Sequence, residues 1–341
     1  MKTLEKVLLN MNDTNALGAA DRAIVEQALG TLRVPMIGAP MFLISGPEFV
    51  MACISAGIGG TLPAANCRTI DDLHHWLKRI GDEVAAMPQS RWAPKWGVNL
   101  VMHRTNPRIE EEIAAIVEHR VPLVVASVGA PDAAIGPVHS YGGKVLCDVV
   151  SLRHARRAID AGVDGLILLT SGAGGHEGSA NPMAFVRSVR QFYDGPLVLA
   201  GCIADGWAMA AARVLGADAV YVGTSLMVAS ESLASEELRE MMLSCNLDDI
   251  MRTNALTGMY ANFMRPSFVQ AGVDPDNLPS GPGIDLADIL ERDLQKKRWK
   301  DIWSAGQGVG IVDRKASIAE IVARFEAQYR SAWEQAVFVD R

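Results

Sequence analysis

The sequence lacks the features that would place it in several specialised classes of protein. Its five cysteines include no C-x-x-C pair and no Cys/His spacing typical of zinc sites, so we expect neither a disulfide framework nor a metal site. No apolar stretch reaches the length of about 18 residues that a membrane span needs, and the first residues lack a signal peptide's apolar segment. We therefore expect a cytoplasmic protein without a membrane span.

An excess of basic residues is also absent. The chain has 32 Lys plus Arg and 39 Asp plus Glu, for a net charge of −7, so nucleic acid is not an expected partner. Hydrophobic residues make up 49% and charged residues 21%, which argues against disorder. The length of 341 residues allows about two domains, or one α/β barrel with additions.

The chain does contain a repeated unit, in which a short apolar run is followed by an amphipathic segment. Several runs are apolar throughout, which is typical of parallel strands buried on both faces. Eight such units in series favour a closed (β/α)8 barrel, known as a TIM barrel, over a doubly wound open sheet. The eight runs are Val34–Gly38, Gly59–Pro63, Lys95–Val101, Pro122–Val128, Lys144–Val150, Asp164–Thr170, Gly195–Gly201 and Asp218–Gly223.

Helix signals separate the runs. Pro107–Arg120 has a proline and acidic residues at its start, whereas Ser151–Ala161 and Asp205–Leu215 begin with a capping residue and end at a glycine. We also expect a closing amphipathic helix over Ile318–Ala336 and a helix within the first 30 or so residues, across the other end of the barrel.

The repeat stops after the eighth run. We interpret residues 225–300 as a helical addition, or lid, over one mouth of the barrel. Residues 1–224 and 301–341 then form the barrel domain.

Candidate site residues follow the predicted strands, because barrel enzymes place their active sites at the carboxyl ends of the strands. Gly201 and Gly223 follow the seventh and eighth strands, where backbone N–H groups of a barrel usually bind phosphate; simple tight turns are the alternative. His176 lies in a glycine-rich stretch after the sixth strand, and we expect it to act as a base at neutral pH. A structural hydrogen bond is the alternative role for this histidine.

Other polar residues near these positions receive less specific interpretations. The remaining six histidines are expected at solvated or helix-surface positions, although His103 could also line the mouth of the barrel. We interpret Cys202 as a small packing residue, since no general base stands beside it in the sequence. Glu177 could orient His176 or lie at the surface, and we favour the surface position.

Several motifs resemble those of a known family. The sequence Ala173–Gly178 (AGGHEG) resembles the Gly-Gly-His-x-Gly signature of the nitronate monooxygenases, formerly called 2-nitropropane dioxygenases. Leu199–Gly206, Leu215–Ala219 and Val222–Thr224 resemble further stretches of the family, as does Trp303–Gln307. The resemblance extends from about residue 34 to about residue 310.

The resemblance implies a TIM barrel that binds FMN, with His176 as the catalytic base toward the acidic proton beside a nitro group. The implied substrates are a nitronate or nitroalkane and O₂. A homodimer is compatible with the resemblance. The residues implied to contact FMN are Ala39, Pro40, Met41, Asn99, Ser127, Asp148, Gly174 and Gly175 around the ring, and Gly201, Cys202, Gly223 and Thr224 around the phosphate.

Four positions depart from the family pattern. Asp148 stands where many members have a lysine, so an anionic reduced flavin should be disfavoured. Gly172 replaces a common glutamate, and Ser225–Leu226 replaces Arg-Phe. Cys202 replaces a glycine, which is harmless if its φ angle is negative.

Two other functions remain open. One is a flavin reductase that uses NAD(P)H, such as the quinone or enoyl-thioester reductases related to the family. The other is an FMN-binding module without chemistry, which the retained His176 argues against.

Overall fold

Eight parallel strands form the centre of the molecule. The structure is a computed structural model that describes residues 19–278 and 302–336. The strands pair in the closed order β10-β11-β2-β3-β5-β6-β7-β8, which excludes the open sheet. They are β2 (Met36–Gly38), β3 (Gly59–Pro63), β5 (Trp96–Val101), β6 (Leu123–Ser127), β7 (Lys144–Val149), β8 (Gly165–Leu169), β10 (Leu197–Ala200) and β11 (Ala219–Val222).

These strands confirm the predicted runs, with bounds that differ by no more than two residues at either end. Alternate residues face the inside and the outside of the barrel. Leu123, Val125 and Ile167 pack inside, whereas Val124 and Leu166 belong to the larger apolar cluster between the strands and the outer helices. Burial on both faces explains why the runs are apolar throughout.

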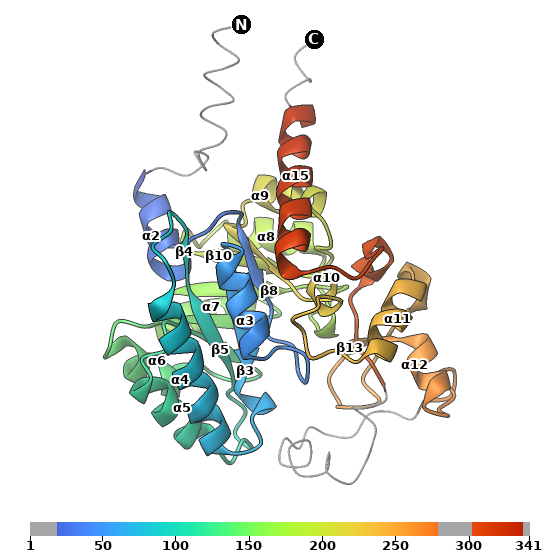
Figure 1. Cartoon of the computed structure of the whole chain (residues 1–341), viewed down its shortest axis with the longest axis horizontal. Coiled ribbons are helices and arrows are strands. Elements are labelled where there is room, and N and C mark those ends of the chain that lie inside the picture. Colours follow the sequence, from blue (N-terminus) through green and yellow to red (C-terminus); the bar gives the residue numbers. More distant parts are fainter. Residues whose placement is uncertain (1–18, 279–301, 337–341) are drawn as a thin grey trace, which may run out of the picture.

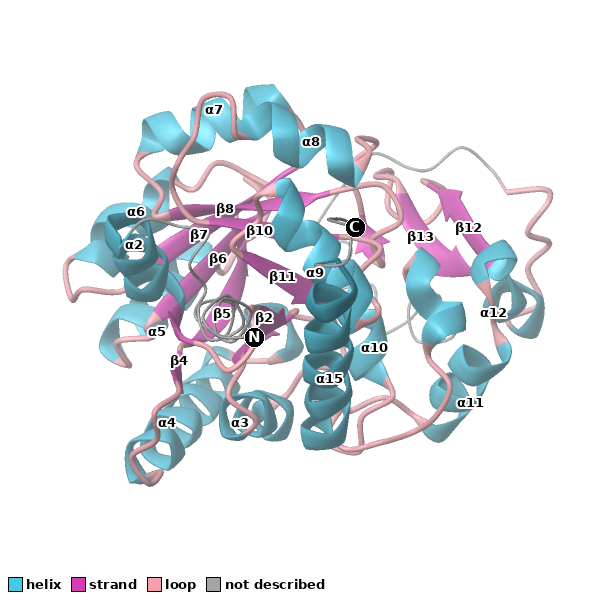
Figure 2. Ribbon diagram, turned by 90° about the horizontal axis from the view of Figure 1, so that it is seen from above, coloured by secondary structure: helices cyan, strands magenta, loops and turns pink. Residues whose placement is uncertain are grey.

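Helices surround the barrel, as Figure 2 shows from above. The predicted helices are confirmed as α5 (Ile109–Glu118), α7 (Leu152–Ala161), α9 (Gly206–Leu215) and α15 (Ile318–Ala336). The other helices around the barrel are α3 (Pro47–Ser55), α4 (Ile70–Ala86), α6 (Asp132–His139) and α8 (Pro182–Val189), with a 3₁₀ turn η1 (Ala64–Asn66) after β3. Helix α15 lies beside α9, so the closing helix completes the outer layer.

The amino-terminal end of the barrel is closed by α2 (Ala19–Leu29), which confirms that part of the expected N-terminal helix. Ala28 and Leu29 are buried against the inward-facing residues of the strands. A short two-stranded pair, β1 (Gly30–Thr31) and β4 (Ala93–Pro94), lies next to this helix. The earlier part of the expected helix, residues 1–18, lies outside the described residues.

The addition after β11 contains strands as well as the expected helices. Its helices are α10 (Thr224–Met227), α11 (Glu236–Ser244) and α12 (Arg265–Gln270), with a 3₁₀ turn η2 (Leu247–Asp249), and its strands are β12 (Ile250–Thr253) and β13 (Ala261–Met264). Figure 1 shows these elements beside the barrel. Strand β13 pairs with β9 (Gly175–His176), so the histidine loop of the barrel and the addition share one sheet. Residues 279–300 of the addition lie outside the described residues.

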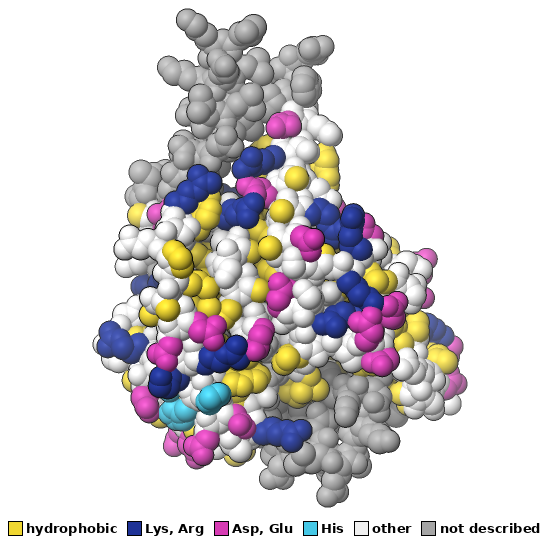
Figure 3. Space-filling view, in the orientation of Figure 1, with side chains coloured by type: hydrophobic (Ala, Val, Ile, Leu, Met, Phe, Trp, Pro, Cys, Tyr) yellow, Lys and Arg dark blue, Asp and Glu magenta, His cyan; other side chains and the backbone are white. Residues whose placement is uncertain are grey.

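The surface carries no large patch of one charge on the face seen in Figure 3, where acidic and basic side chains alternate.

After the addition, the chain returns through η3 (Gln307–Ile311) to α15. Among the helices that the structure describes, none is long and apolar enough to cross a membrane.

Candidate functional site

One cavity of about 2010 Å³ lies at the carboxyl ends of the strands and extends to the addition. It brings together all the residues implied to bind the cofactor and the implied base. These are Ala39, Pro40, Met41, Asn99, Ser127, Asp148, Gly174, Gly175, His176, Gly201, Cys202, Gly223 and Thr224. The prediction that the strand-end residues converge is therefore confirmed, while their roles remain predictions.

The two glycine turns expected to bind phosphate are open to an anion. Gly201 has a φ of +115°, and a Cβ there would lie 2.3 Å from Thr170 Oγ1, so only glycine fits. Within the described part of the chain, no backbone acceptor takes the N–H of Cys202, Ile203 or Gly223. Helix α10 has only four residues, so these N–H groups, more than a helix dipole, would attract a phosphate here.

Cys202 differs from both expectations made for it. Its φ is +58°, so the condition under which a cysteine would be harmless at this position is not met. A left-handed conformation costs a non-glycine residue about 1–2 kcal/mol. The residue also lines the cavity and is exposed, so its interpretation as a packing residue is wrong. Partial desolvation of the thiol by the surrounding loop, together with the nearby Glu177 carboxylate, raises the pKa of Cys202, which agrees with an unreactive thiol.

Polar side chains occupy the inner face of the barrel just below the cavity. Asn99 Nδ2 donates to Ser127 Oγ over 2.8 Å and to the Val125 carbonyl over 3.1 Å. Ser127 Oγ in turn donates to the Leu100 carbonyl over 3.2 Å. Because both bonds use the NH₂ group of Asn99, they fix the orientation of its side-chain amide. They also hold both residues at the cavity floor.

Asp148 is the polar residue of this floor that lacks a partner. It lies on β7 and lines the cavity, yet its Oδ1 is buried and has no hydrogen-bond partner among the residues that the structure describes. Burial raises the pKa of Asp148 to about 7. An orphaned, readily protonated carboxyl group beside a cavity is a candidate ligand-binding group.

His176 is positioned by the strand pairing between the barrel loop and the addition. It pairs with Ala261 of β13, and the preceding residue, Gly175, donates its N–H to Ser304 Oγ over 2.6 Å. Ser304 Oγ donates onward to the Asn262 carbonyl. Burial lowers the pKa of His176 to about 4, so its imidazole is neutral at pH 7.

The tautomer of His176 follows from its contact with the addition. Nε2 lies 3.1 Å from Thr257 Oγ1, and that hydroxyl donates its proton to the Met259 carbonyl. A threonine hydroxyl has a single proton, so here it accepts the N–H of Nε2. A neutral ring that donates through Nε2 carries its lone pair on Nδ1.

Glu177 is buried, so its interpretation as a surface residue is wrong. Its side chain is 1% exposed and its carboxylate accepts the N–H of Gly172, the Asn262 amide and the Arg252 guanidinium. Gly172 stands where the family commonly has a glutamate. The carboxylate of Glu177 lies beside the backbone of Gly172 and accepts its N–H. Glu177 thus joins the glycine loop to β12 and β13.

This network makes a stability prediction. Glu177→Gln replaces one acceptor oxygen with an NH₂ group among donors, so we expect the free energy of unfolding to fall by about 2 kcal/mol. Urea unfolding measures the change. Glu111→Gln, at an exposed site on α5, is the control and should stay within about 0.5 kcal/mol of the parent protein. Equal effects of the two substitutions would contradict the role of Glu177.

Sequence reasoning missed the residues that the addition contributes to the site. Arg252, Thr257, Tyr260 and Asn262 surround the histidine loop, and the Arg252 guanidinium lies 3.8 Å from the centre of the Tyr260 ring. No pattern at these positions marks chemistry. The one available signal was the Trp303–Gln307 stretch, which contains Ser304.

Comparisons with known proteins agree with this site. Residues 83–327 match the family model described as nitronate monooxygenase. A nitronate monooxygenase of Paraburkholderia phytofirmans is 28% identical over 239 residues, which cover 65% of this chain and 65% of that enzyme. The chain therefore matches slightly less than two thirds of that relative's length.

Solved structures show the same fold. FabK from Thermotoga maritima has a TM-score of 0.76 at 22% identity and covers 94% of this chain, with 99% of its own length matched. A nitroalkane oxidase from Streptomyces ansochromogenes also has a TM-score of 0.76 at 22% identity, with 89% of this chain and 98% of that chain covered. Together with the family match, the barrel and its cavity identify this chain as a flavin-dependent oxidoreductase that belongs to the nitronate monooxygenase family.

Proposed function

We propose that this protein oxidises nitronates, and the nitroalkanes that give rise to them, with FMN and O₂. The observation that carries the proposal is the position of His176. A neutral imidazole, oriented through Thr257, lines the same cavity as the two glycine turns that suit a phosphate. The family match and the fold shared with a nitroalkane oxidase support the same reaction.

The residues of the cavity fit FMN. The N–H groups around Gly201 and Gly223 would receive the phosphate. Ala39, Pro40 and Met41 would flank the ring on one side, and Asn99, Ser127 and Asp148 offer amide, hydroxyl and carboxyl groups toward its polar edge. The absence of a Cβ at Gly174 lets the backbone of Gly306 pack against the glycine loop, since a Cβ there would come within 2.9 Å of the Gly306 nitrogen. When bound, FMN would supply the redox chemistry, in which an electron passes from the substrate to the flavin and then to O₂.

The chain's own part in the reaction is proton transfer and positioning. The neutral imidazole of His176 takes the acidic proton beside the nitro group. Because burial lowers the pKa of His176 to about 4, the imidazolium is stable only while it is paired with the nitronate just formed. Proton transfer and retention of the product anion are thus coupled.

An anaerobic reduction experiment tests the proposal. The flavin-loaded protein is mixed without O₂ with propyl nitronate, and separately with NADH or NADPH, while flavin absorbance is followed. We expect bleaching by the nitronate and O₂ consumption after air is admitted. Bleaching by NADH or NADPH alone would overturn the proposal in favour of a flavin reductase. Absence of both bleaching and O₂ uptake would indicate a binding module.

A further inference from the structure

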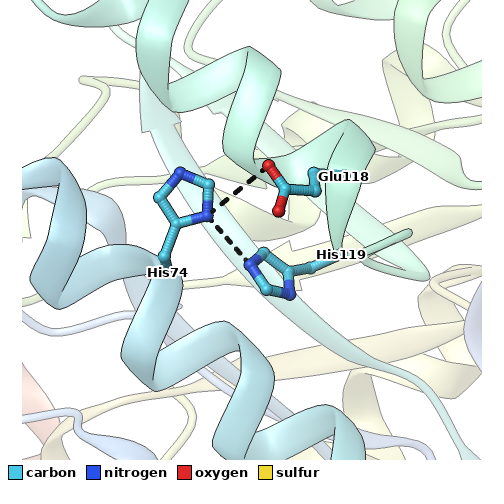
Figure 4. Close-up of side chains that lie close together, drawn as sticks. All are labelled: His74, Glu118 and His119. Atoms are coloured by element: carbon cyan, nitrogen blue, oxygen red, sulfur yellow. Dashed lines mark hydrogen bonds and ion pairs between the residues drawn. The ribbon is translucent and has the colours of Figure 1, made fainter.

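A cluster of metal-ligating side chains lies on the outside of the barrel, apart from the cavity. His74 lies on α4, Glu118 is the last residue of α5, and His119 caps that helix (Figure 4). None of the three lines the cavity described above. In the region of α4 and α5, Figure 3 shows histidine side chains at the surface beside acidic ones.

The ligand atoms of these residues are close enough to share one ion. His74 Nδ1 lies 2.9 Å from His119 Nε2 and 3.8 Å from a Glu118 carboxylate oxygen, and all three ligand atoms lie within 4.8 Å of one another. Zinc binds imidazole nitrogen at about 2.0–2.1 Å, so two ligands of a tetrahedral zinc ion are separated by about 3.3 Å. The observed separations lie on both sides of that value, so small side-chain rotations would complete the geometry.

The chemistry of the cluster also suits a transition metal. Imidazole nitrogens are preferred zinc ligands, and the rings of His74 and His119 already face each other. The Glu118 side chain is 69% exposed, which keeps the site open to solvent for a water ligand. The nearby charges are Lys78 and Asp82 of α4, which form an ion pair with each other over 2.6 Å. Two imidazoles and a carboxylate favour zinc over calcium or magnesium.

We propose that His74, Glu118 and His119 form a binding site for a zinc-class divalent cation. The ion would connect α4 to α5. These helices also meet at their amino-terminal ends, where Arg108 donates to the carbonyls of Cys67 and Arg68 over 3.0 Å, and Arg108 lines the cavity. The metal would therefore stabilise one wall of the barrel without touching the proposed catalytic site.

Calorimetric titration of the EDTA-treated, flavin-loaded protein with zinc chloride tests this site. Every variant compared retains the exposed Cys202 thiol, so any binding to that thiol is common to all of them. One zinc ion should bind, and His74→Ala and His119→Ala should each weaken its affinity at least about tenfold. His75→Ala, an exposed neighbour on α4 outside the cluster, is the matched control and should leave the affinity unchanged.

Cobalt provides a second measurement, which does not depend on the heat of binding. The parent protein loaded with cobalt should show the visible absorption of a tetrahedral ion, and zinc should raise its thermal midpoint, while His119→Ala should lose both effects. Absence of zinc binding, or unchanged stoichiometry and affinity in a His74→Ala/His119→Ala double variant, would overturn the proposal.

Discussion

Turnover of a neutral nitroalkane should fall about 10²–10⁴-fold when His176 is replaced by asparagine, because this is the usual contribution of a positioned general base. Asparagine has no basic nitrogen, and its shorter side chain does not reach the position of Nε2 beside Thr257. Steady-state O₂ consumption with nitroethane, at saturating flavin, measures the loss.

The matched control uses the same variant with a preformed nitronate. This substrate has already lost its proton, so its turnover in His176→Asn should fall far less than turnover of the nitroalkane. Flavin absorbance confirms that the cofactor is still bound. Unchanged turnover of the nitroalkane, or equal losses with both substrates, would show that His176 is not the base.

Replacing Asp148 with asparagine should stabilise the flavin-free protein above pH 7 and have little effect near pH 4. The pKa of this carboxyl is raised from 3.8 to about 7 in the folded protein. Folded and unfolded chains both hold the proton at low pH, so no difference in stability arises there. As the pH rises from 3.8 to about 7, the unfolded chain releases the proton first. The buried carboxyl then increasingly disfavours folding.

The size of the effect follows from the same shift. Each pKa unit corresponds to 1.36 kcal/mol, so the raised pKa of Asp148 gives Asp148→Asn a gain of at most about 4 kcal/mol at pH 8.5. Urea unfolding at pH 4.5 and pH 8.5 measures this gain. Asp194→Asn, at an exposed position, is the control substitution and should leave the free energy of unfolding within about 0.5 kcal/mol of the parent protein. A gain that is equal at both pH values would contradict a buried, protonated carboxyl.

The strands and their order around the cavity could be predicted from the sequence, because both faces of each strand are buried and each run is bounded by small residues. The position of His176 beside the cavity followed from its place after the sixth run. These predictions depend on local patterns, which a single sequence displays directly.

The remaining parts of the site depend on contacts between distant segments. Glu177 looks like a surface residue until β12 and β13 enclose it, and Arg252 and Asn262 lie 75 and 85 residues away along the chain. The left-handed conformation of Cys202 is set by the turn into which it is built, and not by its residue type. The zinc cluster likewise joins His74 and His119, which are 45 residues apart and have no motif spacing.

The pairing of β9 with β13 sets the order in which the site is completed during synthesis. When β11 has left the ribosome, all eight barrel strands have been made, but the partner strand of His176 and the hydroxyl of Ser304 have not. The histidine can therefore be held in place only after segments that follow the last barrel strand have been synthesised, so the barrel strands alone do not make a complete site.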